Sequence, residues 1–439
     1  MTARRPAADT RTAAASAAPA GWERAARLLA PLPEHRSQTP ELSARTPDLL
    51  DRARAERTDF MDRYGLDLYD RLTEDRTRYL RLRELVEAAA VAAPGLVPSP
   101  ARLRAERARP PADRLGYEID LGVFLRGVLR SPAAGAHLLE AMLQPTDRAL
   151  GLLEQFRASG ELQLPSVLLE RRDGAAWITM CATDRLNAED EQQVEDMETA
   201  VDLALLDQDC EIGLIRGGEM THPGYLGRRV FSAGINLKRL HAGEIGLVDF
   251  LLRRELGYLR KLLLGLHTGR ASWRYPFTDM PWVAAVDGFA IGGGMQLLLT
   301  VDHVIAAADS YLSLPAAQEG IVPGAADFRL GILTGPRLAR QIILGGRRIR
   351  ATDPEARTLV DEVVEPGRMD QAVEHALKTL RDPAVTANRR MVNLSVEPAE
   401  AFRCYMAEFA VQQALRIEAA DVLGKAGRFA GRAAPRTAA

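Results

Sequence analysis

Cysteine and long apolar runs are both scarce in this chain, and each shortage excludes a class of protein. Only three cysteines, Cys181, Cys210 and Cys404, occur among 439 residues, and they lack paired spacing. A disulfide scaffold or a zinc ribbon is therefore not expected. No apolar run approaches the roughly 20 residues of a membrane span. Residues 1–20 contain no apolar secretion-signal segment and are predicted to be a disordered leader, so we expect a cytoplasmic protein without a membrane partner.

The usual motifs of metal, nucleotide and nucleic-acid sites are also missing. No strand is followed by Gly-x-Gly-x-x-Gly, and no phosphate-binding Gly-x-x-x-x-Gly-Lys-Ser/Thr loop occurs. A net charge of −2 and a pI near 6.4 disfavour a nucleic-acid partner. We expect no metal and no flavin or other cofactor, although ligands distant in sequence could still converge. The seven histidines have no spacing typical of iron or zinc sites; they are His35, His137, His222, His241, His267, His303 and His375.

What the chain does contain is a glycine triplet, Gly292-Gly293-Gly294, that follows an apolar segment. Residues 283–286 are predicted to form a buried strand, and residues 295–299 are predicted to open an apolar helix. The glycines let the chain turn and approach a ligand closely. Free N–H groups at such a turn can bind an anion or stabilise an oxyanion. The alternative is a turn needed only for tight packing.

A second glycine-bearing loop, residues 231–237, follows the predicted strand 212–215. The order of strand, Ala-Gly-Ile loop, helix, strand, triple glycine and helix resembles the crotonase (enoyl-CoA hydratase/isomerase) superfamily. The resemblance spans roughly residues 166–366, and it implies that the N–H groups of Ile235 and Gly293 form an oxyanion hole for an acyl-CoA thioester. Further matching segments are 186–188, 313–315, 320–325 and 351–364.

The expected fold class is α/β, with a crotonase ββα spiral core, an extra N-terminal helical domain and C-terminal oligomerisation helices. The core begins with a predicted hairpin, strands 167–172 and 175–180 around Asp173-Gly174. The resemblance implies a homo-oligomer, a trimer or a dimer of trimers; a monomeric cap is the alternative. The predicted parts are the leader 1–20, the helical domain 21–165, the core 166–366 and the C-terminal helical region 367–439. Helical periodicity marks residues 76–92, 135–156, 369–380, 384–394 and 398–425.

Gln296 and Ala316 occupy the two positions at which hydratases of this superfamily carry glutamates. Neither side chain is a carboxylate base, so general acid–base addition of water is not expected, whereas the backbone oxyanion hole is retained. The long N-terminal region and segments such as 119–126 and 403–408 resemble the branch of cofactor-independent dioxygenases that act on 3,5-dihydroxyphenylacetyl-CoA. That resemblance implies a stabilised enolate that reacts with O2. The α-peroxide then attacks the thioester, which releases CoA and the arylglyoxylate.

The same resemblance implies roles for individual side chains. Glu189 would accept a hydrogen bond from a ring hydroxyl, Arg254 would donate to one, and Gln296 would place an amide beside the thioester or ring. Ordinary alternatives are a helix-start acid for Glu189, a solvated helix face for Arg254 and a polar helix start for Gln296. The residues expected in an apolar oxygen pocket are Ile235, Leu237, Ala316, Ile321, Val422 and Phe429.

The residue that accepts the α-proton is not identified from the sequence. His222, in a loop before the Ala-Gly-Ile segment, is kept as a substrate-site candidate of open role, since a lone loop histidine is more often an ordinary surface residue. The expected partners are small molecules only, an acyl-CoA thioester and O2. A thioester hydrolase or decarboxylase of the same fold, and a non-catalytic acyl-CoA-binding subunit, remain alternative functions.

Overall fold

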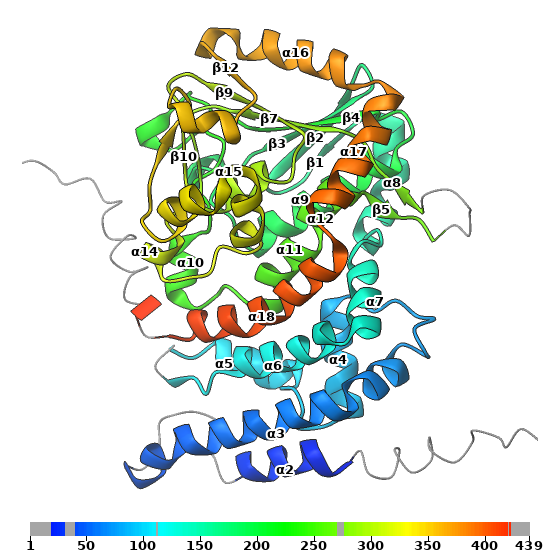
Figure 1. Cartoon of the computed structure of the whole chain (residues 1–439), viewed down its shortest axis with the longest axis vertical. Helices are drawn as coiled ribbons and strands as arrows, with labels where there is room; N and C mark the ends of the chain where they lie inside the picture. The colour runs from blue at the N-terminus through cyan, green and yellow to red at the C-terminus, as the bar shows by residue number, and fades with distance from the viewer. Residues whose placement is uncertain (1–18, 31–39, 111–112, 270–275, 420, 423–439) are drawn as a thin grey trace, which may run out of the picture. The chain divides into compact units, whose positions relative to one another are not determined.

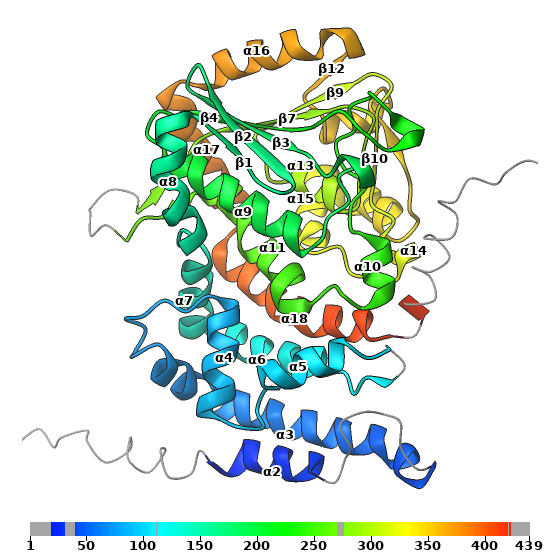
Figure 2. The same ribbon diagram turned by 180° about the vertical axis from the view of Figure 1, so that it is seen from behind.

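The computed structural model describes residues 19–30, 40–110, 113–269, 276–419 and 421–422, which belong to two compact units, Met1–Leu138 and Leu139–Ala439 (Figures 1 and 2). Of the predicted leader, residues 1–18 lie outside the described residues, and Pro19 begins the first helix. The division falls within α7 (Pro132–Met142), so α8 (Asp147–Ser159) and the first strand belong by contact to the second unit.

The first unit is helical, as the periodicity predicted. Helices α3 (Pro40–Leu72) and α6 (Tyr117–Arg130) of this unit pack closely because Gly127 lies at their contact, where an added Cβ would lie 2.5 Å from the Cβ of Met61. Buried Asp120 of α6 accepts a hydrogen bond from Arg54 Nε at 3.0 Å and lies 3.3 Å from Nη1 of Arg57. The helices before α7 are α2 (Pro19–Leu29), α3 (Pro40–Leu72), α4 (Leu82–Ala92), α5 (Pro100–Arg107) and α6 (Tyr117–Arg130).

Two predicted helices of the N-terminal half were wrong in their extent. The segment 76–92 becomes helical only at Leu82, because Glu74, Asp75 and Arg76 adopt positive φ and turn the chain. The segment 135–156 is two helices, α7 and α8, since Pro145 interrupts the pattern and Thr146 caps the second helix through its side chain.

The second unit is built on a seven-stranded sheet with the order β1-β2-β3-β4-β7-β9-β12. Its first three strands are antiparallel, and the pairs from β3 to β12 are parallel. Helix α16 (Met369–Leu380) packs on β4, β7 and β9, and α9 (Glu191–Leu206) packs on β2 and β3 from the other side (Figures 1 and 2). The strands are β1 (Glu161–Gln163), β2 (Val167–Arg172), β3 (Ala175–Met180), β4 (Ile212–Gly217), β7 (Trp282–Val286), β9 (His303–Ala307) and β12 (Glu362–Val364).

A smaller sheet, in the order β11-β10-β8, positions the glycine triplet. Strand β8 (Phe289–Ile291) pairs in parallel with β10 (Tyr311–Ser313), which pairs with β11 (Ile349–Arg350). The chain passes from buried β7 through β8 directly into α13 (Gly293–Leu298). A separate hairpin joins β5 (Leu266–His267) and β6 (Phe277–Thr278). The triplet therefore lies where the small sheet gives way to a helix.

The remaining helices surround these sheets. Helix α15 (Ala326–Ile343) bends at Gly335, whose φ is 76°, just before Pro336. The last predicted helix, 398–425, corresponds to α18 (Ala399–Ile417), which ends earlier than predicted. Residues 423–425 lie outside the described residues. Within the described ranges, no helix has both the length and the apolarity to cross a bilayer. The helices of the second unit not yet named are η2 (Thr183–Arg185), η3 (Pro223–Tyr225), α10 (Leu237–Ala242), the π-helix η4 (Leu247–Leu252), α11 (Arg253–Leu256), α12 (Tyr258–Leu264), α14 (Ala316–Glu319), η5 (Pro354–Thr358), η6 (Pro366–Arg368) and α17 (Pro383–Val396).

Candidate active site

The two glycine-bearing loops lie against each other. Ser232 pairs in parallel with Ala290 of β8, donating to Phe289 O at 3.1 Å and accepting from Ile291 N at 2.9 Å. Gly234 has a φ of +82°, and a Cβ there would lie only 2.7 Å from Ile291 O. A residue with a side chain would therefore push the loops apart, so glycine is required at this contact.

The backbone N–H groups of Ile235 and Gly293, one in each loop, have no hydrogen-bond acceptor among the described residues. Their neighbours are bonded: Asn236 N donates to Glu189 O at 2.8 Å, and Gly292 N donates to Ser313 O at 2.8 Å. The two loops are close enough that a Cβ on Gly234 would lie 3.2 Å from Gly293 N. Both residues line one cavity, so both amides are available to an acceptor bound there.

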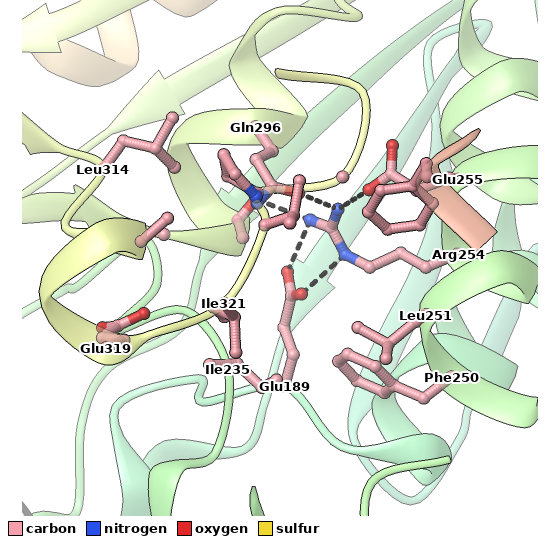
Figure 3. Close-up of a pocket in the computed structure, with 17 residues that line it drawn as sticks. Glu189, Ile235, Phe250, Leu251, Arg254, Glu255, Gln296, Leu314, Glu319 and Ile321 are labelled. Carbon is pink, nitrogen blue, oxygen red and sulfur yellow. Dashed lines mark hydrogen bonds and ion pairs between the residues drawn. The ribbon is translucent and has the colours of Figure 1, made fainter. Parts of the chain in front are cut away.

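A buried arginine lies at the centre of the polar wall of this cavity. The guanidinium of Arg254, 3% exposed, donates to both carboxylate oxygens of Glu189, at 2.7 and 3.2 Å. It also donates to Glu255 Oε1 at 2.9 Å, to Gln296 Oε1 at 2.7 Å and to Gly293 O at 2.6 Å (Figure 3). Burial alone would lower the pKa of Arg254, but the carboxylate of Glu189 and other neighbours raise it above its ordinary value. Arg254 is therefore a fixed cation.

Two glycines make room for the carboxylates that this cation holds. A Cβ on Gly293 would lie 2.3 Å from Glu189 Oε2, and a Cβ on Gly324 would lie 2.1 Å from Glu255 Oε1. Glu255 is held further by Ala325 N, which donates to Oε2 at 3.0 Å. The glycine triplet thus serves both the free amide and the ion pair behind it.

Comparison with known proteins identifies the family. The enoyl-CoA hydratase/isomerase family model matches residues 170–397. The chain belongs to the enoyl-CoA hydratase/isomerase family. It is 60% identical over 408 residues to the "(3,5-dihydroxyphenyl)acetyl-CoA 1,2-dioxygenase" of Amycolatopsis orientalis, covering 93% of this chain and 94% of the relative. It is 25% identical over 240 residues to a short-chain-enoyl-CoA hydratase of Clostridium acetobutylicum, covering 54% of this chain and 84% of the relative.

Solved structures of enoyl-CoA hydratases share the fold. The crystal structure of one from Mycobacterium avium subsp. paratuberculosis aligns with a TM-score of 0.50 at 20% identity, over 61% of this chain and 99% of its own. The predicted crotonase fold is therefore confirmed, with additional helices on either side of the family core.

In this enoyl-CoA hydratase/isomerase family member, most of the predicted site residues line a single cavity of about 30 Å³. They are Glu189, Ile235, Arg254, Gly293, Gln296, Ala316 and Ile321. Others do not line it: Leu237 begins α10, Val422 is buried elsewhere, and Phe429 lies outside the described residues. His222 is also outside the cavity, where its Nδ1 accepts from Gly224 N at 3.2 Å and caps η3. In this position the His222 side chain stabilises a local turn.

Several residues of the cavity were not predicted. Phe250 and Leu251 come from the π-helix η4, and Leu314 and Phe409 complete the apolar wall. Glu255 and Glu319 add two carboxylates. No group of three or more His, Cys, Asp or Glu side chains suited to a metal ion occurs in the part of the chain that the structure describes.

Glu319 differs from the other two carboxylates because its side chain has no hydrogen-bond or ion-pair partner among the described residues. It ends the short helix α14 and is 8% exposed (Figure 3). Burial raises the pKa of Glu319 from an ordinary 4.5 to about 7. The folded protein therefore keeps this carboxyl group protonated up to about pH 7 and ionised above it.

Glu319→Gln is expected to make the stability less sensitive to pH. Below pH 4.5 the carboxyl is protonated in both folded and unfolded chains, so it contributes no pH dependence. Between pH 4.5 and about 7 the unfolded chain ionises first, so the wild type loses stability as the pH rises. The free energy of unfolding of the variant relative to that of the wild type should increase by on the order of 3 kcal/mol from pH 4.5 to 8, as measured by urea unfolding at each pH. A pH-independent difference would contradict the raised pKa.

Proposed function

We propose that this protein is a dioxygenase that converts 3,5-dihydroxyphenylacetyl-CoA and O2 to 3,5-dihydroxyphenylglyoxylate and CoA without a metal or organic cofactor. The observation that carries the proposal is the 60% identity to the Amycolatopsis dioxygenase over 93% of this chain. That similarity includes the N-terminal region, which lies outside the 170–397 match to the family model. A general likeness to hydratases would leave that region unmatched.

The free amides of Ile235 and Gly293 support an enolate mechanism. A thioester oxygen between them would be stabilised as negative charge develops, an effect of about 3 kcal/mol for one such donor. Loss of an α-proton gives the enolate, which adds O2 at the α-carbon. The peroxide displaces CoA thiolate from the carbonyl, and loss of the second α-proton cleaves the O–O bond to give the keto acid. Both oxygen atoms enter the product, and one of the two protons ends on the CoA thiol.

The Arg254 network supports recognition of a hydroxylated ring. Ring hydroxyls both donate and accept, so Glu189 and Arg254 offer complementary partners, and the NH2 group of Gln296 has no hydrogen-bond partner among the described residues. An enclosed space of about 150 Å³ holds benzene, whereas this cavity is about 30 Å³. Ring binding therefore requires the lining side chains to move apart. The present cavity has the size for a molecule such as O2.

We also propose that the chain forms a homo-oligomer, a trimer or a dimer of trimers. Helix α17 exposes Met391 (67%), Val392 (57%) and Leu394 (50%) to solvent. A cluster of exposed apolar side chains of this kind is typical of surfaces that another protein covers. The proposal otherwise rests on the family resemblance of the C-terminal helices.

Chelator-treated enzyme is expected to consume one O2 for each CoA released from 3,5-dihydroxyphenylacetyl-CoA. An oxygen electrode and a thiol assay measure the two quantities, with phenylacetyl-CoA and butyryl-CoA as comparison substrates. Butyryl-CoA should react slowest, because its α-proton lacks the acidifying ring. Equal CoA release without oxygen would instead identify a thioester hydrolase. Binding of the thioester without any turnover would identify a non-catalytic subunit.

A further inference from the structure

The carboxylate of Glu319 lies in the same small cavity as the two free amides. Glu319 and Ala316 both line it, and they occupy the ends of the four-residue helix α14. Residues three apart on a helix lie on one face, so the chain places a carboxylate one turn beyond the methyl group of Ala316. The Glu319 side chain is also buried, with 8% exposure. A charged side chain buried without a partner is costly, and such a cost is typical of a functional group.

The other two carboxylates of the cavity are already committed. Glu189 accepts two hydrogen bonds from the Arg254 guanidinium. Glu255 accepts from Arg254 on one oxygen and from Ala325 N on the other. A carboxylate that is bonded to a buried guanidinium is a weak base, because protonation would break the ion pair. Among the described residues that line the cavity, Glu319 is the carboxylate with both oxygens unoccupied.

We propose that Glu319 is the catalytic base that removes the α-proton of the acyl-CoA thioester. This inference rests on the proposed enolate chemistry. The α C–H bond breaks, its proton passes to a carboxylate oxygen of Glu319, and its electron pair passes into the enolate whose oxygen the amides of Ile235 and Gly293 hold. Glu319 then gives that proton to the departing CoA thiolate. The regenerated carboxylate accepts the second α-proton as the O–O bond breaks, and it releases that proton to solvent before the next turnover.

The shared lining of the cavity favours this transfer. Glu319, Ile235 and Gly293 line the same cavity, so a substrate group held by the two amides borders the wall that carries Glu319. The α-carbon is bonded directly to the carbonyl carbon whose oxygen the two amides would hold. A carbon in that position lies in the space that Glu319 also lines. A buried base near neutral pH is matched to a carbon acid of this type.

The test separates proton removal from oxygen chemistry. 3,5-Dihydroxyphenylacetyl-CoA is incubated with enzyme in D2O without oxygen, and mass spectrometry follows α-deuterium incorporation; O2 uptake with the same substrate is measured in parallel. Glu319→Gln is expected to lower both rates by about 10²–10⁴-fold. Its dissociation constant for a non-hydrolysable phenylacetyl-CoA thioether should change less than about threefold, since the amide keeps the shape of the site. Formate added to Glu319→Ala should restore part of the exchange.

Gln318→Ala is the matched control, because Gln318 is exposed on the same helix and does not line the cavity. It should exchange and consume O2 at wild-type rates. If Glu319→Gln retains both rates within about threefold, the assignment is wrong. If the wild type exchanges through Glu319 but consumes no O2, the dioxygenase proposal fails while the base assignment stands. If the wild type shows neither activity, both proposals fail.

Discussion

Replacing Arg254 with alanine is expected to destabilise the protein by about 3–5 kcal/mol and to abolish recognition of the hydroxylated ring. The variant leaves Glu189 and Glu255 buried, at 2% exposure each, without the cation that both contact. An uncompensated buried charge explains the stability loss. For 3,5-dihydroxyphenylacetyl-CoA, kcat/KM should fall by about 10²–10³-fold, because charge-assisted hydrogen bonds contribute about 1.5–3 kcal/mol each. For phenylacetyl-CoA the fall should be much smaller.

Arg253→Ala is the matched control for this prediction. Arg253 precedes Arg254 on α11 and bonds Glu198 at 2.8 Å, yet it does not line the cavity. Glu198 keeps Lys261 as a partner at 2.9 Å, so this variant should be milder in stability and unchanged in ring preference. The double variant Glu189→Gln/Arg254→Met removes both members of the pair and should recover part of the lost stability without recovering activity. Equal losses with both ring substrates would show that Arg254 is structural only.

The strands and C-terminal helices were largely predictable because local patterns determine them. Strands β2 and β3 have the predicted bounds, since alternating burial and an Asp-Gly turn mark a hairpin. Helix α16 also has its predicted bounds, and its apolar face packs on the sheet. Helix limits failed where turn residues decided them, at Glu74–Arg76 before α4 and at Pro145 between α7 and α8. Local pattern specifies the element more reliably than its ends.

The residues of the site could be predicted only where the family resemblance indicated which sequence positions to consider. Glu189 and Arg254 are 65 residues apart in sequence, so no local pattern indicates that they meet. Arg254, in an Arg-Arg-Glu run, had a solvated face as its ordinary alternative, but it is 3% exposed. The π-helix η4 precedes it, and a π-turn shifts the phase of a helix by one residue. Counting by 3.6 residues therefore could not assign Phe250 and Leu251 to the cavity.

Glu319 shows the limit of sequence reasoning most clearly. Its neighbours Gln318 and Gly320 suggest a short polar turn, yet the side chain is buried in a cavity that is also lined by residues distant in sequence, such as Phe250 and Phe409. One signal was available. Position 316 is one at which the resemblance to hydratases led us to expect a glutamate, and an acid three residues later lies on the same helical face, so Glu319 can place a carboxylate at that wall. Considering every acid on that helical turn, instead of position 316 alone, would have identified Glu319 as a candidate.

The second large effect is expected for Gly293→Ala, which adds a single methyl group. Its Cβ would lie 2.3 Å from Glu189 Oε2, and Glu189 cannot easily swing away because Arg254 holds both of its oxygens. Either the loop moves and displaces the Gly293 amide, or the ion pair breaks. Loss of one oxyanion donor lowers kcat by about 10²–10³-fold, so anaerobic α-exchange and O2 uptake should both fall by that factor.

A double-mutant cycle on phenylacetyl-CoA exchange isolates the cause of this loss. In a Glu189→Ala background the methyl group meets no carboxylate, so Gly293→Ala should cost much less than it does in the wild type. Gly331→Ala is the matched control, because Gly331 lies in helix α15 with nothing within 4 Å of an added Cβ. That change should leave activity intact and stabilise the helix by up to about 1 kcal/mol. An equal cost of Gly293→Ala in both backgrounds would mean that the Glu189 contact does not hold the amide in place.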